Sequence, residues 1–313
     1  MYRIGIDLGG TNIATGLVTE DGKLLKKIST LTRGERSAEE ITIDMAETAF
    51  KLIDGENISR EEIISIGIGV PGAVDDDNGI CVLTANLPYK NFNIAEVFKR
   101  YADIPVRLAN DANCAALGEA ISGAARGRRS VVVVTLGTGV GGGVIMDGKV
   151  YAGFNFAGGE LGHMVTHKGG RQCGCGRKGC LEAYASATAL IKDTREAAEN
   201  NPDSYLYRIC NGDLEKLNGK SAFDGKEAGD KISADVVENY IDELAIGVIN
   251  YINIFQPEIL LLGGGVANQK ENLLKPLREK VFKEVYGADF LPRTEIACTV
   301  LGNDAGIIGA AML

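Results

Sequence analysis

No apolar run in this sequence reaches membrane-spanning length, and no segment is strongly basic. The candidate stretch 131–146 is cut by five glycines, whereas a spanning helix needs about 20 consecutive apolar residues. The formal net charge is −9, which argues against a nucleic-acid binder because such proteins normally carry a basic face. These absences predict a soluble, cytoplasmic protein with neither a membrane nor a nucleic acid as partner.

Prolines are few, seven against 41 glycines, which indicates tight turns and close backbone approaches in place of a disordered linker. No secretory leader is expected, since Asp7 interrupts the only apolar run near the N-terminus. The seven cysteines are an odd number. In what we interpret as a reducing compartment, a disulfide framework is therefore not expected.

Strand-like and helix-like segments alternate along the chain, which is typical of an α/β fold. The length of 313 residues and the hydrophobic content of 45% suffice for one or two domains with substantial cores. Residues 200–232 are polar and are expected to form short helices or a surface insertion. The patterns predict strands at 3–7, 13–18, 63–70, 105–110, 130–135 and 258–262, and helices at 37–54, 111–125, 186–199, 233–255, 270–286 and 304–312.

Two segments of the sequence share one layout. Residues 4–11 and 133–139 each contain a strand, a small polar residue and a glycine turn, followed by a segment able to return as a hairpin strand. This repetition predicts a duplicated α/β architecture with a cleft between the halves. The expected domains are 1–115, with the C-terminal helix of about 302–313 packing on it, and 116–301.

One imidazole and three thiols are gathered within eighteen residues. Their pattern, His-x9-Cys-x-Cys-x4-Cys, matches the ligand set of a closed tetrahedral zinc site. Two carboxylates, Glu160 and Glu182, flank the motif, so a structural Zn²⁺ would also fix two acids of a polar substrate pocket. The candidate ligands are His163, Cys173, Cys175 and Cys180. Unrelated buried thiols are the alternative, and His167 competes with His163 because spacing alone does not decide between them.

Three glycine turns follow strand-like segments, at 7–12, 135–143 and 263–265. Glycines let backbone N–H groups approach phosphate oxygens closely, and hydroxyl and amide side chains add donors. A carboxylate here can hold Mg²⁺ through water. None of the turns has P-loop or Rossmann spacing, and each alone is also explained as a plain turn, but together they favour nucleotide binding. The candidates for ATP and Mg²⁺ are Asp7, Gly9, Gly10, Thr11, Asn12, Thr135, Gly137, Thr138, Gly139, Gly263 and Gly264.

Asp111 lies where a strand becomes a helix, directly after Asn110. An isolated aspartate at such a place is best explained as a helix cap. Here a neighbour can take over the capping, and Asn110 can hydrogen-bond a polyol. The motifs contain a cluster of acids but no obvious nucleophilic cysteine or serine. Such a set of residues suits the activation of a substrate hydroxyl group for phosphoryl transfer, so Asp111 is the candidate base.

These motifs together resemble the ROK family of sugar kinases and repressors, from residue 1 to the C-terminus. The resemblance implies a two-lobed actin-like ATPase or hexokinase-type fold of duplicated ribonuclease-H-like domains with a small zinc knot. It rests on Asp7-x-Gly-Gly-Thr, Gly69-Val-Pro-Gly72, Asn110-Asp111-Ala-Asn113, Leu136-Gly-Thr-Gly139, Gly159-Glu-x-Gly-His163 and Cys173-x-Cys-Gly-x-x-Gly-Cys180-Leu-Glu.

The resemblance also implies roles for individual residues. Asp111 becomes the catalytic base, zinc is held by His163 and not by His167, and the protein is expected to be a homodimer or a tetramer. The residues expected to bind the sugar are Asn110, Asp111, Glu160, His163, Glu182, Gly72 and Asn86.

The activity implied is phosphorylation of glucose to glucose 6-phosphate, with ATP and Mg²⁺. Residues 84–88 and the long region 186–255 look more like the glucokinases of the family, but N-acetylglucosamine, N-acetylmannosamine and fructose stay open as substrates. ADP and polyphosphate stay open as phosphoryl donors. The repressors of the family carry a helix-turn-helix domain before the kinase-like part, whereas here the first strand starts at Tyr2. We therefore expect a kinase.

Overall fold

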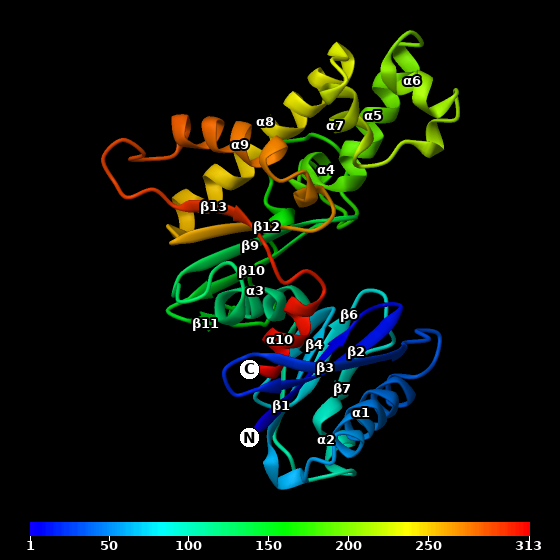
Figure 1. Ribbon diagram of the computed structural model, residues 1–313, viewed down its shortest axis with the longest axis vertical. Coiled ribbons are helices and arrows are strands. Elements are labelled where there is room, and N and C mark those ends of the chain that lie inside the picture. Colours follow the sequence, from blue (N-terminus) through cyan, green and yellow to red (C-terminus); the bar gives the residue numbers. More distant parts are fainter. The chain divides into compact units, whose positions relative to one another are not determined.

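The computed structural model describes residues 1–313, and these fall into two compact units (Figure 1). The first unit contains Met1–Val131, Gly143–Gly159 and Thr299–Leu313. The second contains Val132–Gly142 and Glu160–Cys298. The expected boundary at residue 115 falls inside helix α3 (Asp111–Ser122), which lies entirely in the first unit.

The first sheet has the order β3-β2-β1-β4-β8. Strands β1, β2 and β3 follow one another and pair antiparallel, whereas β4 pairs parallel to β1 and β8 parallel to β4. The parallel strands are reached through crossover helices, as parallel pairing requires. The bounds are β1 (Tyr2–Leu8), β2 (Asn12–Thr19), β3 (Leu24–Leu31), β4 (Ile63–Val70) and β8 (Val106–Asn110).

The second sheet repeats this plan with the order β11-β10-β9-β12-β13. Three consecutive strands again lie on one side, and β12 and β13 pair parallel on the other. The duplicated α/β architecture predicted from the sequence is confirmed by this repeated order. The bounds are β9 (Val131–Leu136), β10 (Val140–Met146), β11 (Lys149–Val150), β12 (Ile259–Gly263) and β13 (Glu295–Cys298).

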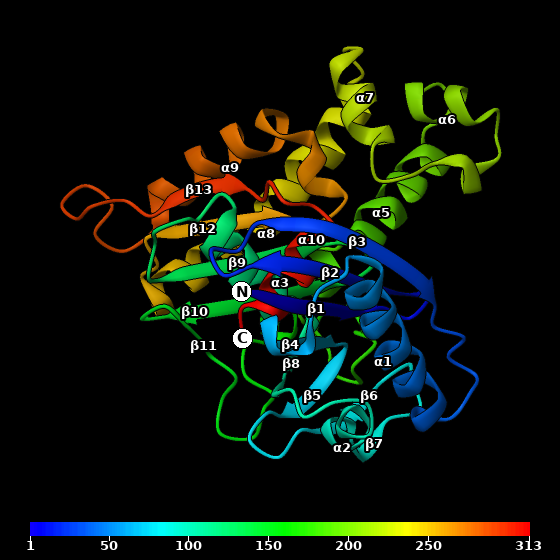
Figure 2. The ribbon, with the colours of Figure 1, turned by 60° about the horizontal axis from the view of Figure 1, so that its bottom comes forward.

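Helix α1 (Ala38–Gly55) covers one face of the first sheet (Figure 2). It starts with the predicted capping box, in which Ser37 and Glu40 each bond the other's backbone N–H. Alternate residues of β1, Ile4 and Ile6, are fully buried in the same core as Ile41 of the helix. A short helix, α2 (Ile94–Lys99), and the 3₁₀ turn η1 (Arg60–Glu62) complete this side.

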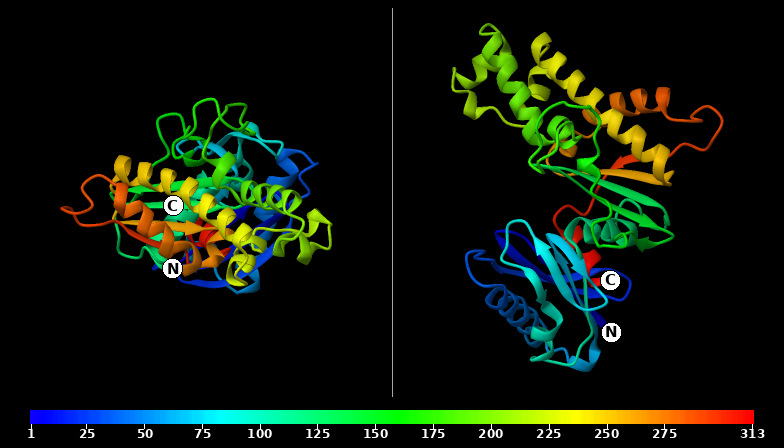
Figure 3. Two further views of the ribbon diagram at one scale, coloured as in Figure 1. Left: turned by 90° about the horizontal axis from the view of Figure 1, so that it is seen from above. Right: turned by 180° about the vertical axis from the view of Figure 1, so that it is seen from behind.

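Helix α10 (Asp304–Ala311) packs against α3 in the first unit, and both chain termini lie in this unit (Figure 3). The two helices approach so closely that a Cβ atom at Gly309 would lie 1.7 Å from the carbonyl oxygen of Cys114. Glu119 of α3, which is fully buried, ties down the segment that leads into α10. Its Oε1 accepts hydrogen bonds from the backbone N–H groups of Val300, at 3.0 Å, and Leu301, at 2.9 Å.

A third, small antiparallel sheet and strand β3 were not foreseen. The small sheet has the order β5-β6-β7, with β5 (Gly72–Asp75), β6 (Ile80–Thr84) and β7 (Lys90–Asn93). These strands are short and largely half-buried or exposed, so they lack the apolar run or strict alternation that marks a strand in sequence.

In the second unit, α8 (Lys231–Phe255) lies beside α9 (Glu271–Glu284), as Figure 1 shows. The buried Tyr251 of α8 donates a hydrogen bond to the carbonyl oxygen of Leu161, at 2.7 Å. Residues 200–232 form short helices, as predicted. None of the helices combines the length and apolar character that a membrane span requires. The remaining elements are α4 (Glu182–Ala185), α5 (Ala187–Asn200), α6 (Tyr205–Cys210), α7 (Ser221–Glu227), and the 3₁₀ turns η2 (Leu161–His163), η3 (Leu214–Lys216) and η4 (Val266–Gln269).

Candidate active site

Asp111 is the first residue of α3, and Asn110 caps that helix. The Oδ1 atom of Asn110 accepts hydrogen bonds from the backbone N–H groups of Ala112, at 2.9 Å, and Asn113, at 3.3 Å. Its Nδ2 atom donates to the carbonyl oxygen of Gly72, at 3.3 Å. Capping thus falls to the neighbour of the candidate base, and the Asp111 carboxylate is carried on a junction fixed to both β5 and α3.

Asp7, at the end of β1, faces the same junction in the first unit. Burial raises the pKa of Asp7 to about 6, and the charge of Asp111 contributes to the rise. Two carboxylates that repel one another in a half-buried place suit a hard divalent cation with oxygen ligands, such as Mg²⁺. The residues present therefore fit the expected metal ion.

The thiol of Cys114 lies near these two acids but does not offer a nucleophile. Burial raises its pKa well above the ordinary value, and the charges of Asp7 and Asp111 raise it further. The thiol therefore stays protonated and buried, and only thiolates act as nucleophiles. This agrees with a site that activates a hydroxyl group of the substrate.

The first glycine turn is held in shape by a residue that the sequence did not point to. Thr32 donates its hydroxyl to the carbonyl oxygen of Gly9, at 2.6 Å, and its backbone N–H to that of Thr11, at 2.9 Å. A Cβ atom at Gly10 would meet no atom within 4 Å, so packing within the chain does not explain the glycine. Thr11 and Asn12 are exposed. The turn therefore presents backbone and side-chain donors to solvent.

The turn at 137–139, between β9 and β10, is fastened to the start of α5. The backbone N–H of Ala187 donates to the carbonyl oxygen of Gly137, at 2.8 Å, and the hydroxyl of Thr188 to that of Thr138, at 2.7 Å. A Cβ atom at Gly137 would also meet open space, whereas one at Gly139 would lie 2.3 Å from Oε2 of Glu182. The last glycine of the turn thus makes room for a candidate sugar-binding acid.

The third glycine turn has a different explanation. Gly264 has a φ of +83°, and a Cβ atom there would lie 2.5 Å from the carbonyl oxygen of Leu136. The close approach of β12 and β9 accounts for this glycine without a ligand. Gly263 is the buried last residue of β12, and Thr135 is half-buried near the end of β9.

The four candidate zinc ligands come together in the second unit, with all ligand atoms within 4.8 Å of one another. The Sγ atoms of Cys175 and Cys180 are 3.7 Å apart, and Sγ of Cys173 lies 3.7 Å from Nδ1 of His163. Metal distances of about 2.3 Å for sulfur and 2.0 Å for nitrogen give tetrahedral ligand separations of about 3.5–3.8 Å. Geometry and donor set therefore both fit Zn²⁺.

His167 lies outside this ligand set. Its Nε2 atom is 3.6 Å from Oε1 of Glu243, and its ring stacks on Tyr184 with centroids 4.3 Å apart. The alternative that sequence spacing left open is thereby resolved in favour of His163, because only the imidazole of His163 faces the thiols.

The remaining candidate residues lie on loops. Glu160 is exposed and directly precedes η2, which carries His163. Asn86 is exposed between β6 and β7 of the first unit. Asn86 lies in the first unit, as do Asn110, Asp111 and Gly72. Glu160 lies in the second unit, as do His163 and Glu182.

In a comparison with known protein families, residues 3–313 of this chain match the ROK family. The glucokinase of Thermotoga maritima is 41% identical over 311 residues, which are 99% of this chain and 96% of that protein. A ROK family glucokinase from Streptomyces griseus, solved in complex with glucose and AMPPNP, is 31% identical with a TM-score of 0.79, covering 99% and 98% of the chains. The ROK hexokinase from Thermus thermophilus is 32% identical with a TM-score of 0.80, covering 100% and 97%.

Proposed function

We propose that this chain, which belongs to the ROK family, is an ATP-dependent glucokinase that phosphorylates the 6-hydroxyl group of glucose. The identity of 41% with a glucokinase over nearly the whole length supports the activity. Glucose and AMPPNP in the related Streptomyces griseus structure support the substrate pair. The observation in this chain that carries the proposal is the junction of Asn110 and Asp111, which holds a carboxylate beside the half-buried Asp7.

Asp111 acts as general base toward the 6-hydroxyl group of the sugar. Its carboxylate accepts a hydrogen bond from that hydroxyl and orients it toward the γ-phosphoryl group of ATP. It takes the hydroxyl proton as the new ester bond forms and the bond from the γ-phosphorus to the departing ADP breaks. In a loose transition state the proton leaves late, so orientation carries much of the effect. The rigid junction matters because a misplaced carboxylate loses both contributions.

The donor side consists of the two glycine turns that packing leaves unexplained. Backbone N–H groups around Gly10 and Gly137, with the side chains of Thr11, Asn12 and Thr138, bind the phosphates of ATP. Asp7 would hold Mg²⁺, and the ion would supply positive charge to the phosphate oxygens. The further residues proposed for the nucleotide are Gly9, Thr135, Gly139, Gly263 and Gly264.

The acceptor side consists of hydrogen-bonding groups for the sugar hydroxyls. Glu182 is fixed by the backbone N–H of Val140 and faces Cys173, so the zinc ligands His163, Cys173, Cys175 and Cys180 would hold the acid in place through the metal. His163 can bind zinc with one ring nitrogen and a hydroxyl with the other. The proposed sugar ligands are Asn110, Asp111, Glu160, His163, Glu182, Gly72 and Asn86.

We further infer a cytoplasmic homodimer, because ATP and free sugar meet in the cytoplasm and kinases of this family are expected to form dimers. A panel of glucose, fructose, mannose, N-acetylglucosamine and N-acetylmannosamine, tested with ATP and Mg²⁺ by ADP release, decides the substrate. Glucose should give the highest kcat/KM. A higher value for an N-acetylhexosamine or for fructose would replace glucose, and activity with polyphosphate but not ATP would replace the donor.

A further inference from the structure

The three thiols of the zinc motif differ in how far solvent reaches them. Cys175 is exposed, whereas Cys173 and Cys180 are buried. Cys175 also lies within an uninterrupted run of exposed residues, 174–178. One thiol ligand of the candidate metal site is therefore open to small molecules from solution, while the other two are covered by the protein.

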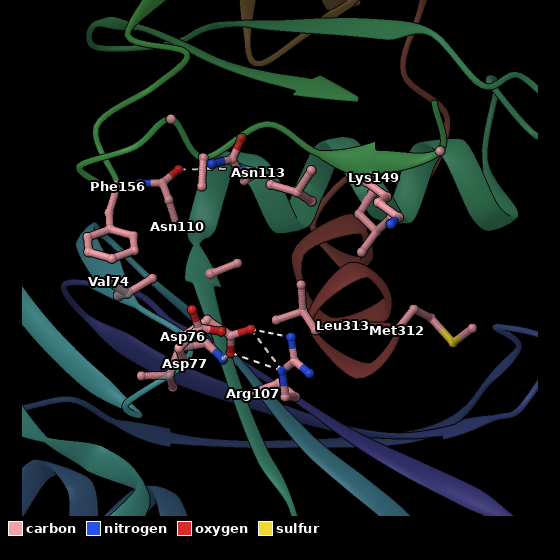
Figure 4. Close-up of a pocket in the computed structure, with 17 residues that line it drawn as sticks. Val74, Asp76, Asp77, Arg107, Asn110, Asn113, Lys149, Phe156, Met312 and Leu313 are labelled. Carbon is pink, nitrogen blue, oxygen red and sulfur yellow. Dashed lines mark hydrogen bonds and ion pairs between the residues drawn. The ribbon is translucent and has the colours of Figure 1, made fainter. Parts of the chain in front are cut away.

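The four cysteines outside the motif are less accessible than Cys175. One is half-buried, Cys298, and three are buried, Cys81, Cys114 and Cys210. The cavity of about 390 Å³ beside β8, with α3 on its wall, gives no route to Cys114 of that helix, because no cysteine lines it (Figure 4). Cys175 is thus the only exposed thiol of the seven, and an oxidant in solution meets it first.

A second thiol lies beside Cys175, and the backbone around Cys175 is free to move. Its Sγ atom is 3.7 Å from Sγ of Cys180, so a disulfide of about 2.05 Å needs an approach of roughly 1.7 Å. Cys175 is flanked by Gly174 and Gly176, and a Cβ atom at either glycine would meet no atom within 4 Å. Because glycine is conformationally permissive and packing does not restrain these two, the exposed thiol can reach the buried one.

A bond between these two thiols would remove half of the zinc ligands. Only His163 and Cys173 would remain, too few for the closed four-ligand site that holds a structural zinc ion. The loss would extend to Glu182, because its Oε1 atom lies 3.4 Å from Sγ of Cys173. Glu182 also follows Cys180 by only two residues. The state of the thiols is therefore linked to an acid that we assign to the sugar.

We propose that Cys175 and Cys180 form a redox switch, in which a peroxide converts the two thiolates into a disulfide, zinc is released and the affinity for glucose falls. The thiolate of Cys175 attacks one peroxide oxygen, the O–O bond breaks, and a sulfenic acid and hydroxide form. The thiolate of Cys180 then attacks this sulfur, the S–S bond forms, and the S–O bond breaks with loss of a second hydroxide. Two protons from solvent turn both hydroxides into water.

The two sulfur atoms lose two electrons in this reaction, and hydrogen peroxide takes them up. A dithiol reverses the change by thiol–disulfide exchange, which returns both thiolates to the metal. The effect on glucose rests on the proposed function, whereas disulfide formation and zinc release do not.

The test treats the whole zinc-loaded protein with hydrogen peroxide. A chromophoric chelator measures released zinc, peptide mass spectrometry locates the disulfide, and titration gives the affinity for glucose. We expect release of about one zinc ion per chain, the content of one closed site, together with a disulfide between Cys175 and Cys180. Glucose affinity should fall to that of the Cys175→Ser variant, and dithiothreitol with added Zn²⁺ should restore both zinc and affinity.

Two variants separate this switch from general thiol oxidation. Cys175→His keeps a zinc ligand but lacks the exposed thiol, so it should retain its zinc in the same concentration of peroxide. Cys298→Ser is the matched control outside the ligand set and should release zinc as the unchanged protein does.

Four results would overturn the switch: zinc that stays bound in peroxide, release without a disulfide at Cys175, release that dithiothreitol and Zn²⁺ do not reverse, or equal release from Cys175→His. If Cys175→His does not bind zinc, the disulfide map of the unchanged protein decides. Zinc release with unchanged glucose affinity would overturn the effect on the sugar alone. A protein that does not phosphorylate glucose would refute the proposed function, while the zinc and disulfide measurements would still test the switch.

Discussion

The Sγ atom of Cys173 lies 3.4 Å from Oε1 of Glu182, whose Oε2 atom accepts a hydrogen bond from the backbone N–H of Val140, at 3.0 Å. One carboxylate therefore connects the candidate zinc motif with the turn between β9 and β10. The turn belongs to the proposed ATP site and the acid to the proposed sugar site. Loss of the metal should therefore affect the residues of both sites.

Cys175→Ser should remove the metal and weaken glucose binding. The protein as isolated should hold about one zinc ion per chain, the number expected for one closed four-ligand site, and the variant should hold far less. Glucose affinity should fall because Glu160 and Glu182 lose their anchored support. Elemental analysis and glucose titration measure the two effects, with Cys298→Ser as the matched control outside the ligand set. A zinc-free protein with full activity would refute the structural role.

Asp111→Asn should reduce kcat by at least about 10²-fold, the lower range for loss of a general base. The amide keeps the shape and can still hydrogen-bond the 6-hydroxyl group, so glucose affinity should stay within a small factor. Steady-state kinetics and a binding titration separate the two quantities. The exposed Asp103→Asn serves as control. If the variant turns over glucose about as fast as the unchanged protein, Asp111 is not the base, and Glu160 and Glu182 become the candidates.

The pKa of Asp7 predicts a pH-dependent stability in Mg²⁺-free buffer. Its value is about 6 in the folded protein against 3.8 for an ordinary aspartate, so the folded state retains a proton that the unfolded state has released. The free energy of unfolding should therefore fall as pH rises through this window, by about 1 kcal/mol between about pH 5 and about pH 7.5. Urea unfolding of the protein and of Asp7→Asn isolates the effect, because the amide does not titrate. Parallel pH dependences for both proteins would contradict the prediction, and Mg²⁺ should restore stability only where Asp7 is present.

Gly309→Ala should destabilise the first unit by roughly 3 kcal/mol or more, or prevent folding, because an added methyl group in a closely packed interior forces the helices apart. The obstacle is backbone, the carbonyl oxygen of Cys114, which cannot rotate away as a side chain can. Gly219→Ala is the matched control, since a Cβ atom there meets open space. Urea unfolding measures both variants. A difference of less than about 1 kcal/mol between them would show that α10 moves aside easily.

Sequence was sufficient where a signal lies within a short stretch. The β-branched run 131–134 predicted a buried strand, and Ser37 with Glu40 predicted a helix start, because propensity and capping act between residues only a few positions apart. The zinc motif was visible for the same reason, since all four candidate ligands lie within eighteen residues. The repeated strand and glycine turn likewise predicted the duplicated sheets.

Tertiary structure decided the rest. It brought His163 and not His167 to the thiols, a choice that spacing had left open and that only the family resemblance had made. It also assigned the cap of α3 to Asn110 and joined Glu182 to Val140 across 42 positions. It also placed Thr32 beneath the first glycine turn and left the glycine at position 264 explained by packing. These outcomes depend on which segments meet in space, and packing settles that through many weak contacts that no local pattern records. The sequence by itself therefore determined the elements and the candidate chemistry of this protein, whereas only the folded chain decided which side chains hold that chemistry in place.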